Sequence, residues 1–240
     1  SKIKLNIFYR IIFSLKIIFY LNNVRYNMII SRSIIASLIL AIFGIKNILE
    51  VHTELTGVTK YFFYLTRLKF VKKNLKFIFI NNFLRKKFRV NQKNSIILYD
   101  AVDYRDFKPN YNNTIKNTCF YSGSFSRGKG LEIILKISKK LPQINFHLYG
   151  NKDTIYDKLI LEKKYKNVYF KGYLKYSKLV KKINNYKILL MPYKKKVSVL
   201  IKEINVEKYF SPLKMFDYLA SGKIIIASNL PVYKNILKNK

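Results

Sequence analysis

Apolar residues along this chain form short runs that alternate with longer segments of helical spacing. The short runs are rich in Ile, Val, Leu and Phe and predict buried strands; they span residues 26–31, 46–51, 75–80, 94–99, 118–124, 144–150, 167–172, 186–192 and 223–228. The longer segments predict helices; they span residues 33–44, 58–73, 81–90, 130–141, 153–165, 175–185 and 211–222. This alternation predicts an α/β fold with parallel sheets and helical crossovers.

The polar segment 100–116 interrupts the alternation, which then begins again. It contains Pro109 and three of the twelve acidic residues. We therefore predict two domains, residues 1–108 and 109–240. The first opens on a helix and the second stops inside a helical segment, so we expect the first to be incomplete at its N-terminus and the second at its C-terminus.

The first helical segment, residues 3–21, is apolar but interrupted by Lys4, Arg10 and Lys16. No charge-free run approaches the roughly 20 residues of a membrane span. The segment predicts a mostly buried or interfacial helix.

The composition is strongly basic: 47 Lys and Arg face 12 Asp and Glu, a formal net charge of +35, and residues 1–49 hold no acid. Such a charge suits nucleic acid, an anionic membrane surface or phosphorylated substrates. The codon bias of an AT-rich genome would produce the same excess. The single cysteine, Cys119, excludes an intramolecular disulfide and indicates a reducing compartment.

The stretch YSGSFSRGKGLEIIL carries the first candidate chemistry. Gly123, Gly128 and Lys129 have the spacing of a phosphate-binding P-loop, but Gly130 stands where that motif needs a Ser or Thr for Mg²⁺. The dinucleotide pattern G-x-G-x-x-G also fails. What remains is a strand that ends in a Gly-rich turn, with Arg127 and Lys129 at the mouth of a helix. The alternative is a basic turn that binds nothing.

A second stretch, SPLKMFDYLASGKIIIASNLP, begins with a strong helix start. Ser211 is a candidate N-cap and Pro212 fits the first helical position. The free N–H groups of Leu213 and Lys214 would then face an anion at the positive end of the helix. Asp217 lies one turn further on the same side. Lys214 and Asp217 could equally be a surface pair.

Both stretches resemble sequences of the GT-B glycosyltransferases, in the large retaining group called family 4. Many members read S-P-x-K-x-x-E-Y-x-A-x-G-K-P-I-[IV]-A-S-x-L-P at the second stretch and G-x-x-x-x-x-K-G-x-x-x-[IL]-[IL] at the first. Two further segments match the family in order and spacing, VYFKGYL and YKILLMPY. Four earlier segments match it more weakly: IISRS, ILEVHTE, FIFINNFLRKKF and LYDAVDYRDFKP. The resemblance covers residues 26–240 and is most specific over 209–231.

The resemblance implies a GT-B fold, in which two Rossmann-like domains face each other across a cleft that holds a nucleoside-diphosphate sugar. It places Lys129 and the turn at Gly123 on the diphosphate. The family's Arg position is occupied by Ser124, so Arg127 is a substitute candidate. Asp217 matches the acid that binds the donor ribose, and Tyr173 lies in the family's base-contact loop.

The resemblance also makes the helix start at Ser211, Leu213 and Lys214 part of the donor site. His52, in EVH, matches a position where members often hold an active-site histidine; a structural role is equally open. Tyr209 replaces a further Glu of many members. There is no D-x-D metal motif, and helix dipole and basic side chains can replace Mg²⁺, so we expect no metal and no cofactor.

The resulting prediction is a metal-independent, retaining, hexosyltransferase-like enzyme of cell-envelope polysaccharide biosynthesis. Its expected partners are a nucleotide sugar, a cell-surface glycan or lipid-linked acceptor, and an anionic membrane surface, with no nucleic acid. We expect it in the cytoplasm, peripheral at the inner face of the cytoplasmic membrane. The alternatives are a basic nucleic-acid-binding protein and an inactive fragment of the enzyme.

Overall fold

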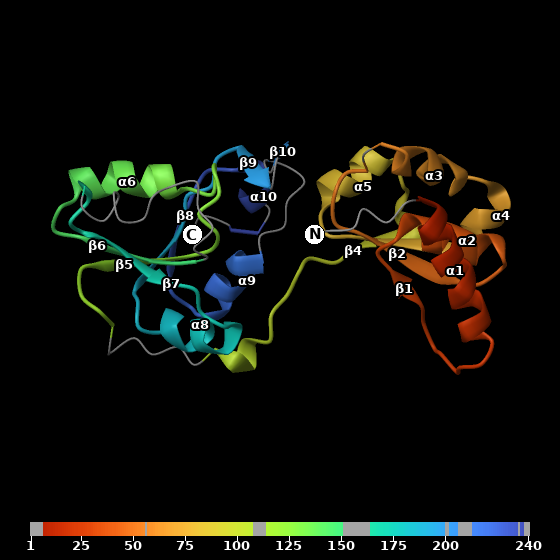
Figure 1. Cartoon of the computed structure of the whole chain (residues 1–240), viewed down its shortest axis with the longest axis horizontal. Coiled ribbons are helices and arrows are strands. Elements are labelled where there is room, and N and C mark those ends of the chain that lie inside the picture. The colour runs from red at the N-terminus through yellow and green to blue at the C-terminus, as the bar shows by residue number, and fades with distance from the viewer. Residues whose placement is uncertain are drawn as a thin grey trace. The chain divides into compact units, whose positions relative to one another are not determined.

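The computed structural model describes residues 7–55, 57–107, 114–150, 164–199, 202–205, 213–234 and 236–237. The chain forms two compact units, residues 1–99 and 100–240 (Figure 1). The division therefore falls earlier than the predicted one after residue 108. The reason is that Phe107 is only 5% exposed and belongs to the hydrophobic core of the second unit, against which Val102 also packs.

The first unit contains a four-stranded parallel sheet in the order β1-β2-β3-β4. Its strands are β1 (Ile30–Ser31), β2 (Asn47–Val51), β3 (Leu75–Phe79) and β4 (Ser95–Ile97). Its helices are α1 (Ile7–Leu21), α2 (Ile34–Ile42), α3 (Thr59–Leu65), α4 (Lys69–Lys72), α5 (Asn82–Phe88) and the 3₁₀ turn η1 (Gln92–Asn94). The parallel sheet predicted from the alternating pattern is thus present in this half.

Two helices of the first unit show how local sequence determines their limits. Ser33 caps α2, because its hydroxyl accepts from the Ala36 N–H at 3.3 Å. The predicted helix over 58–73 is instead split into α3 and α4. The chain is extended at Leu68, with ψ of 138°, and the Thr66 hydroxyl donates to the Phe63 carbonyl at 2.6 Å. That local bond occupies a carbonyl at the end of α3.

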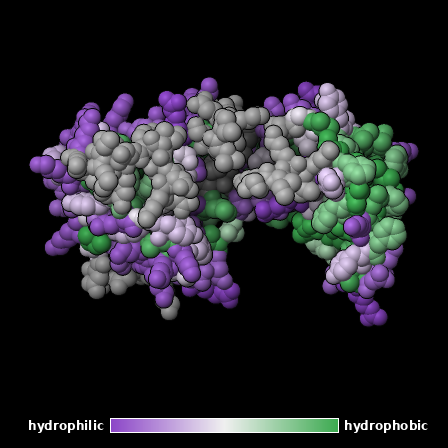
Figure 2. Space-filling view, in the orientation of Figure 1, coloured by the Kyte–Doolittle hydropathy of each residue, from purple (hydrophilic) through white to green (hydrophobic). Residues whose placement is uncertain are grey.

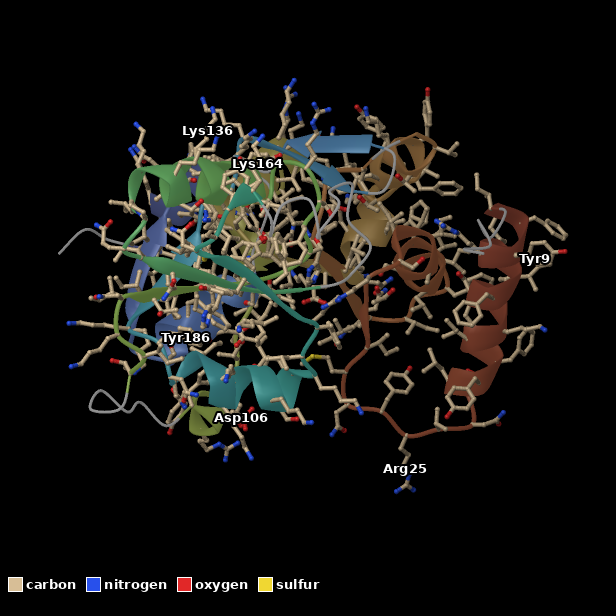
Figure 3. The ribbon with its side chains drawn as sticks, turned by 60° about the vertical axis from the view of Figure 1, so that its left-hand side comes forward. Tyr9, Arg25, Asp106, Lys136, Lys164 and Tyr186 are labelled. Carbon is tan, nitrogen blue, oxygen red and sulfur yellow. The ribbon has the colours of Figure 1, made fainter. Side chains whose placement is uncertain are left out.

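Helix α1 packs against α2 and presents its other side to solvent. Ser14 is its one fully buried residue, and the Ser14 hydroxyl donates to the Arg10 carbonyl at 2.7 Å. The outer side carries exposed aromatic residues: Phe8, Tyr9, Phe13, Phe19 and Tyr20. Figure 3 shows Tyr9 pointing outward from this helix. Among the described residues, no helix is both long and apolar enough to cross a membrane.

The second unit contains a five-stranded parallel sheet in the order β11-β8-β5-β6-β7. Its strands are β5 (Thr118–Ser122), β6 (Asn145–Tyr149), β7 (Val168–Gly172), β8 (Ile188–Met191) and β11 (Ile224–Ala227). Its helices are the 3₁₀ turn η2 (Tyr104–Asp106), α6 (Leu131–Lys140), α8 (Tyr176–Ile183), α9 (Leu213–Ala220) and α10 (Pro231–Lys234). The helix predicted at 153–165 lies almost entirely outside the described residues.

The strand order creates a switch point between β5 and β8. From β5 the chain continues outward through β6 and β7, and β8 then returns to the other side of β5. In open α/β sheets, ligands bind beyond the carboxyl ends of the strands at such a point. After β8 the chain forms an antiparallel hairpin of β9 (Lys196–Val199) and β10 (Lys202–Asn205), neither of which is among the predicted strands.

The core of the second unit is rich in tyrosine and phenylalanine. Phe120, on the central strand β5, lies 5.1 Å from the Tyr149 ring and 4.9 Å from the Tyr186 ring, centroid to centroid. Tyr186 is fully buried, and its hydroxyl hydrogen-bonds Nδ1 of His147 at 2.8 Å. His147 therefore has the structural role expected of a histidine inside a strand.

Candidate functional site

The switch point begins at the turn that follows β5. Gly123 has a φ of 144°, a conformation that favours glycine, and its N–H donates to the Tyr149 carbonyl at 2.8 Å. A Cβ at this position would lie 2.9 Å from Nζ of Lys214. Gly123 therefore leaves room for the Lys214 ammonium directly beyond the end of β5.

The rest of the turn is held by a buried tyrosine. The Tyr121 hydroxyl lies 3.2 Å from the Ser124 carbonyl and 3.1 Å from the Lys129 carbonyl, so its one proton is shared between them. Nζ of Lys129 donates to the Ser124 hydroxyl at 2.8 Å. Burial lowers the pKa of Lys129 from its ordinary value. The Lys129 side chain is thus fixed at the turn, with only a hydroxyl as its partner there.

The two later glycines of the turn serve close packing. A Cβ on Gly128 would clash with the Lys196 carbonyl, and one on Gly130 would lie 2.5 Å from Cγ of Pro192. The Lys194 N–H donates to the Gly128 carbonyl at 2.8 Å, which ties the turn to the end of β8. Gly128 and Gly130 are therefore explained by close contact between the turn and the backbone segment that follows β8.

Lys214, in the first turn of α9, points into this region. Its Nζ lies 4.0 Å from the ring centroid of Tyr121 and 4.8 Å from that of Tyr193. Within the described part of the chain, this buried nitrogen has no hydrogen-bond partner. Burial, and next the positive charge of Lys129, hold the pKa of Lys214 well below its ordinary value. The site thus contains a buried amine that has no hydrogen-bond acceptor among the described residues.

Asp217 lies one turn further along α9 and is 7% exposed. Its Oδ1 accepts a hydrogen bond of 2.9 Å from the Tyr176 hydroxyl at the start of α8. Burial raises the pKa of Asp217, and the Tyr176 bond and Lys214 oppose this rise. Lys214 and Asp217 are therefore buried at the switch point, which contradicts the alternative of a surface pair.

Tyr218 links α9 to the end of β5 by hydrogen bonds. Its hydroxyl accepts from the Ser122 N–H at 3.1 Å and lies 3.2 Å from the Ser122 hydroxyl. Because this contact joins positions 96 residues apart in the sequence, it brings Gly123, Lys129, Lys214 and Asp217 into one site. Sequence reasoning missed the tyrosines that build it. Their alternation with apolar residues made them look like ordinary core positions.

The other predicted donor residues that the structure describes are exposed. Arg127 is exposed on the turn, Leu213 is exposed at the start of α9, and Tyr173 is exposed just after β7. Ser211 lies outside the described residues. The structure therefore shows neither the predicted N-cap nor a contact from Arg127 to the buried lysines.

His52 belongs to the first unit, directly after β2. Its Nε2 lies 3.0 Å from Oε1 of Glu50, and the Arg32 guanidinium donates to Oε2 of the same Glu50 at 2.8 Å. The bond from Arg32 is the main cause that lowers the pKa of Glu50. These residues line a cavity of about 740 Å³, together with Tyr9 and Phe13 of α1. His52 is thus held beside a carboxylate at a cavity wall.

The described residues contain no group of three or more His, Cys, Asp or Glu side chains that could hold a metal ion. The polar groups at the switch point are instead two lysines, one aspartate and tyrosine hydroxyls. Such a set is suited to an anion with a neighbouring hydroxylated group.

Comparison with protein families shows which family the chain belongs to. Residues 103–240, more than half of the chain and almost all of the second unit, match the family described as Glycosyl transferases group 1. The chain belongs to that family. No curated protein matches this sequence at the threshold used for relatives.

Solved structures of glycosyltransferases share the fold. The glycosyltransferase from Rickettsia africae ESF-5 has a TM-score of 0.71 at 12% identity, covering 100% of this chain and 67% of that one. The lipopolysaccharide outer core galactosyltransferase WaaB has a TM-score of 0.64 at 14% identity, with the same 100% and 67% coverage. Sucrose-phosphate synthase from Thermosynechococcus elongatus has a TM-score of 0.61 at 15% identity, covering 91% and 60%.

At these identities the likeness shows the fold alone, and this glycosyltransferase chain spans about two thirds of the length of these relatives. The GT-B fold class and the family membership predicted from the sequence are both confirmed. The roles of the site residues stay predictions.

Proposed function

We propose that this chain binds a nucleoside-diphosphate sugar at the switch point of its second unit and takes part in transfer of that sugar to an acceptor hydroxyl. The observation that supports this most strongly is the pair of lysines beside the Gly123 turn. Lys129 has only a hydroxyl partner at that turn, and the Lys214 amine has no hydrogen-bond partner among the described residues. A diphosphate would supply the missing acceptors.

The chemistry follows from the charge that the reaction creates. The bond between the sugar C1 and the diphosphate oxygen breaks while the acceptor oxygen forms the new bond to C1. Negative charge develops on the departing diphosphate, which takes up the proton that the acceptor hydroxyl loses. Lys129 and Lys214 are placed to stabilise that charge. The Asp217 carboxylate, three residues after Lys214 on the same helix, is suited to the ribose hydroxyls.

Metal independence, retention of configuration and the acceptor class belong to the same proposal. The two lysines and the start of α9 would stabilise the negative charge of the diphosphate in place of Mg²⁺. Arg127, Tyr173 and Ser211 remain proposed donor contacts, and His52 a proposed active-site residue on the acceptor side. The resemblance to family 4 supports retention and a cell-surface glycan or lipid-linked acceptor.

One solved neighbour supports the class of donor. The E. coli structure named "Trehalose-6-phosphate" contains UDP-2-fluoro glucose, and it matches this chain with a TM-score of 0.63 at 10% identity over 93% of this chain and 63% of that one. That ligand is a nucleoside-diphosphate sugar, which is the chemistry proposed here.

A thermal-shift panel of UDP, GDP, ADP and CDP sugars tests the donor. At least one of them should raise the melting temperature in EDTA, and NMR of the slowly released sugar should show the anomer of the donor. If no nucleotide sugar shifts the melting temperature, or if the shift requires Mg²⁺ or Mn²⁺, the proposed site is wrong. Release of the opposite anomer contradicts retention.

We also propose that the first unit lies at an anionic membrane surface in the cytoplasm. The aromatic outer side of α1 and its basic neighbours Arg10, Lys16 and Arg25 have the composition of an interfacial helix. Figure 2 shows hydrophobic residues gathered over one side of this unit. Each basic side chain near such a surface adds about 1 kcal/mol.

Liposome flotation tests this location. Binding should require anionic lipid, weaken with salt and fall when Phe13 and Phe19 are both changed to Ser. The matched control is Tyr104→Ser, an exposed aromatic of the second unit. Flotation that survives the double change on α1 refutes the role of this face.

A further inference from the structure

We propose that Tyr176 is a positioning residue for Asp217: its hydroxyl holds Oδ1 of the carboxylate, so that Oδ2 is aimed at a ribose hydroxyl of the donor. This inference rests on the proposed function and adds a residue from a different element of the second unit. Its consequence is that the preference of the site for ribonucleotides depends on the Tyr176 phenol, which acts through the Asp217 carboxylate.

The contact joins two helices that are far apart in the sequence. Tyr176 is the first residue of α8 and Asp217 lies in the middle of α9, 41 residues later, yet the Tyr176 hydroxyl and Oδ1 are 2.9 Å apart. Asp217 is 7% exposed, whereas Tyr176 is 47% exposed. The phenol therefore reaches from the surface of the unit to a carboxylate that is otherwise enclosed.

A hydrogen bond that holds Oδ1 of Asp217 also determines the orientation of Oδ2. The terminal torsion of an aspartate is broad, so a carboxylate without a partner samples several orientations. A charge-assisted hydrogen bond to Oδ1 removes that freedom and leaves Oδ2 as an acceptor of known direction. Asp217 also has one methylene less than the Glu common at this position, so its reach depends more on orientation.

The protonation states suit this arrangement. Burial is the main cause that raises the pKa of Tyr176 to about 12, so the phenol keeps its proton and donates at neutral pH. The same hydrogen bond, followed by the charge of Lys214, opposes the rise that burial causes in the pKa of Asp217. Tyr176 thereby helps to keep the carboxylate ionised, which is the form that accepts from a ribose hydroxyl.

A comparison of ligands with and without ribose hydroxyls isolates this role. We would titrate the full chain by calorimetry with UDP, GDP and ADP, and then with the 2′,3′-dideoxy form of each nucleotide that binds. Hydrogen bonds to a charged group are worth about 1.5–3 kcal/mol, so the wild type should bind the ribonucleotide roughly ten-fold or more tightly than its dideoxy form.

Tyr176→Phe should reduce this ratio several-fold, and mainly by weakening the ribonucleotide. Asp217→Asn should reduce it further, and Tyr176→Phe added to Asp217→Asn should change the ratio little, because both residues act through one carboxylate. Tyr104→Phe, which removes a hydroxyl 74% exposed on η2, should leave the ratio unchanged.

The outcomes separate this inference from the proposed function. If wild-type chain binds nucleotides but Tyr176→Phe leaves the ratio unchanged, or weakens both forms equally, Tyr176 has at most a structural role and the inference is wrong. If the wild type binds none of the nucleotides, the proposed function fails and the inference fails with it.

Discussion

Replacing the buried amine of Lys214 should stabilise the fold, although it should weaken the proposed binding of a diphosphate. Lys214→Met keeps the length of the side chain and removes the nitrogen. Burying a polar group without a hydrogen bond costs about 1–3 kcal/mol in proteins. Because Nζ of Lys214 has no hydrogen-bond partner among the described residues, the variant should be more stable by about that amount.

Two contacts of Lys214 work against this gain. Its Nζ lies over the rings of Tyr121 and Tyr193, and a desolvated cation–π contact is worth about 2 kcal/mol. That attraction requires the charged form, however, and burial holds the pKa of Lys214 well below its ordinary value. The desolvation penalty should therefore outweigh the ring contacts.

The pH dependence has a definite sign. Since the pKa of Lys214 is lower in the folded state than in the unfolded state, the unfolded chain binds more protons between these two values. Wild-type stability should then rise with pH by at most about 1.4 kcal/mol per unit. The advantage of Lys214→Met should shrink as the pH rises toward the ordinary value of 10.5.

Urea denaturation followed by circular dichroism measures these effects. The exposed Lys136→Met on α6 is the matched control and should leave the midpoint almost unchanged. A nucleoside diphosphate should stabilise the wild type and Lys136→Met, but not Lys214→Met. If Lys214→Met is destabilised by 1 kcal/mol or more, the amine is stabilised by its rings and the argument from burial is refuted.

Further predictions concern the turn and the core of the second unit. Gly130→Ala should cost more in urea than Gly44→Ala. Both positions have a positive φ, which costs an alanine about 1–2 kcal/mol. At Gly130 a Cβ would also meet Pro192, which should add roughly 1–3 kcal/mol, whereas nothing lies within 4 Å at Gly44; equal costs would contradict the packing argument. Lys129→Ala should weaken nucleoside diphosphate binding by about 1.5–3 kcal/mol and nucleoside binding very little, whereas equal losses would show that Lys129 acts through folding. Burial is the main cause that lowers the pKa of His147 to about 4, with Lys171 and Lys182 adding to it, so wild-type stability should fall as the pH drops from 6.5 toward 4; an NMR titration of His147 with a midpoint near 6.5 would contradict this.

Much of the fold could be predicted because strands and helices alternate with clear apolar runs. Each predicted strand contains an observed one, and the parallel pairing followed from the crossovers between them. The hairpin of β9 and β10 was missed because its lysines, such as Lys196 and Lys202, interrupt the apolar pattern that predicts strands. The boundary was placed too late because Phe107, a core residue, lies in a polar stretch.

The site could be predicted only where local motifs carry it. Lys129 and Lys214 were predicted from the Gly-rich turn and the helix start, and the structure brings both to the turn at Gly123; their role in donor binding stays a prediction. Tyr176 could not be found, because its link to Asp217 depends on how two helices pack. The sequence predicted diphosphate contact only for the turn at Gly123, and only the structure relates Gly128 and Gly130 to the backbone after β8.

Calorimetric titration of the chain with nucleoside diphosphates in EDTA tests the central claim most directly. The account predicts a binding site with a stoichiometry of one for at least one of UDP, GDP, ADP and CDP, and its loss in Lys129→Ala combined with Lys214→Met. Binding that appears only after Mg²⁺ or Mn²⁺ is added, or that persists in the double variant, would contradict it.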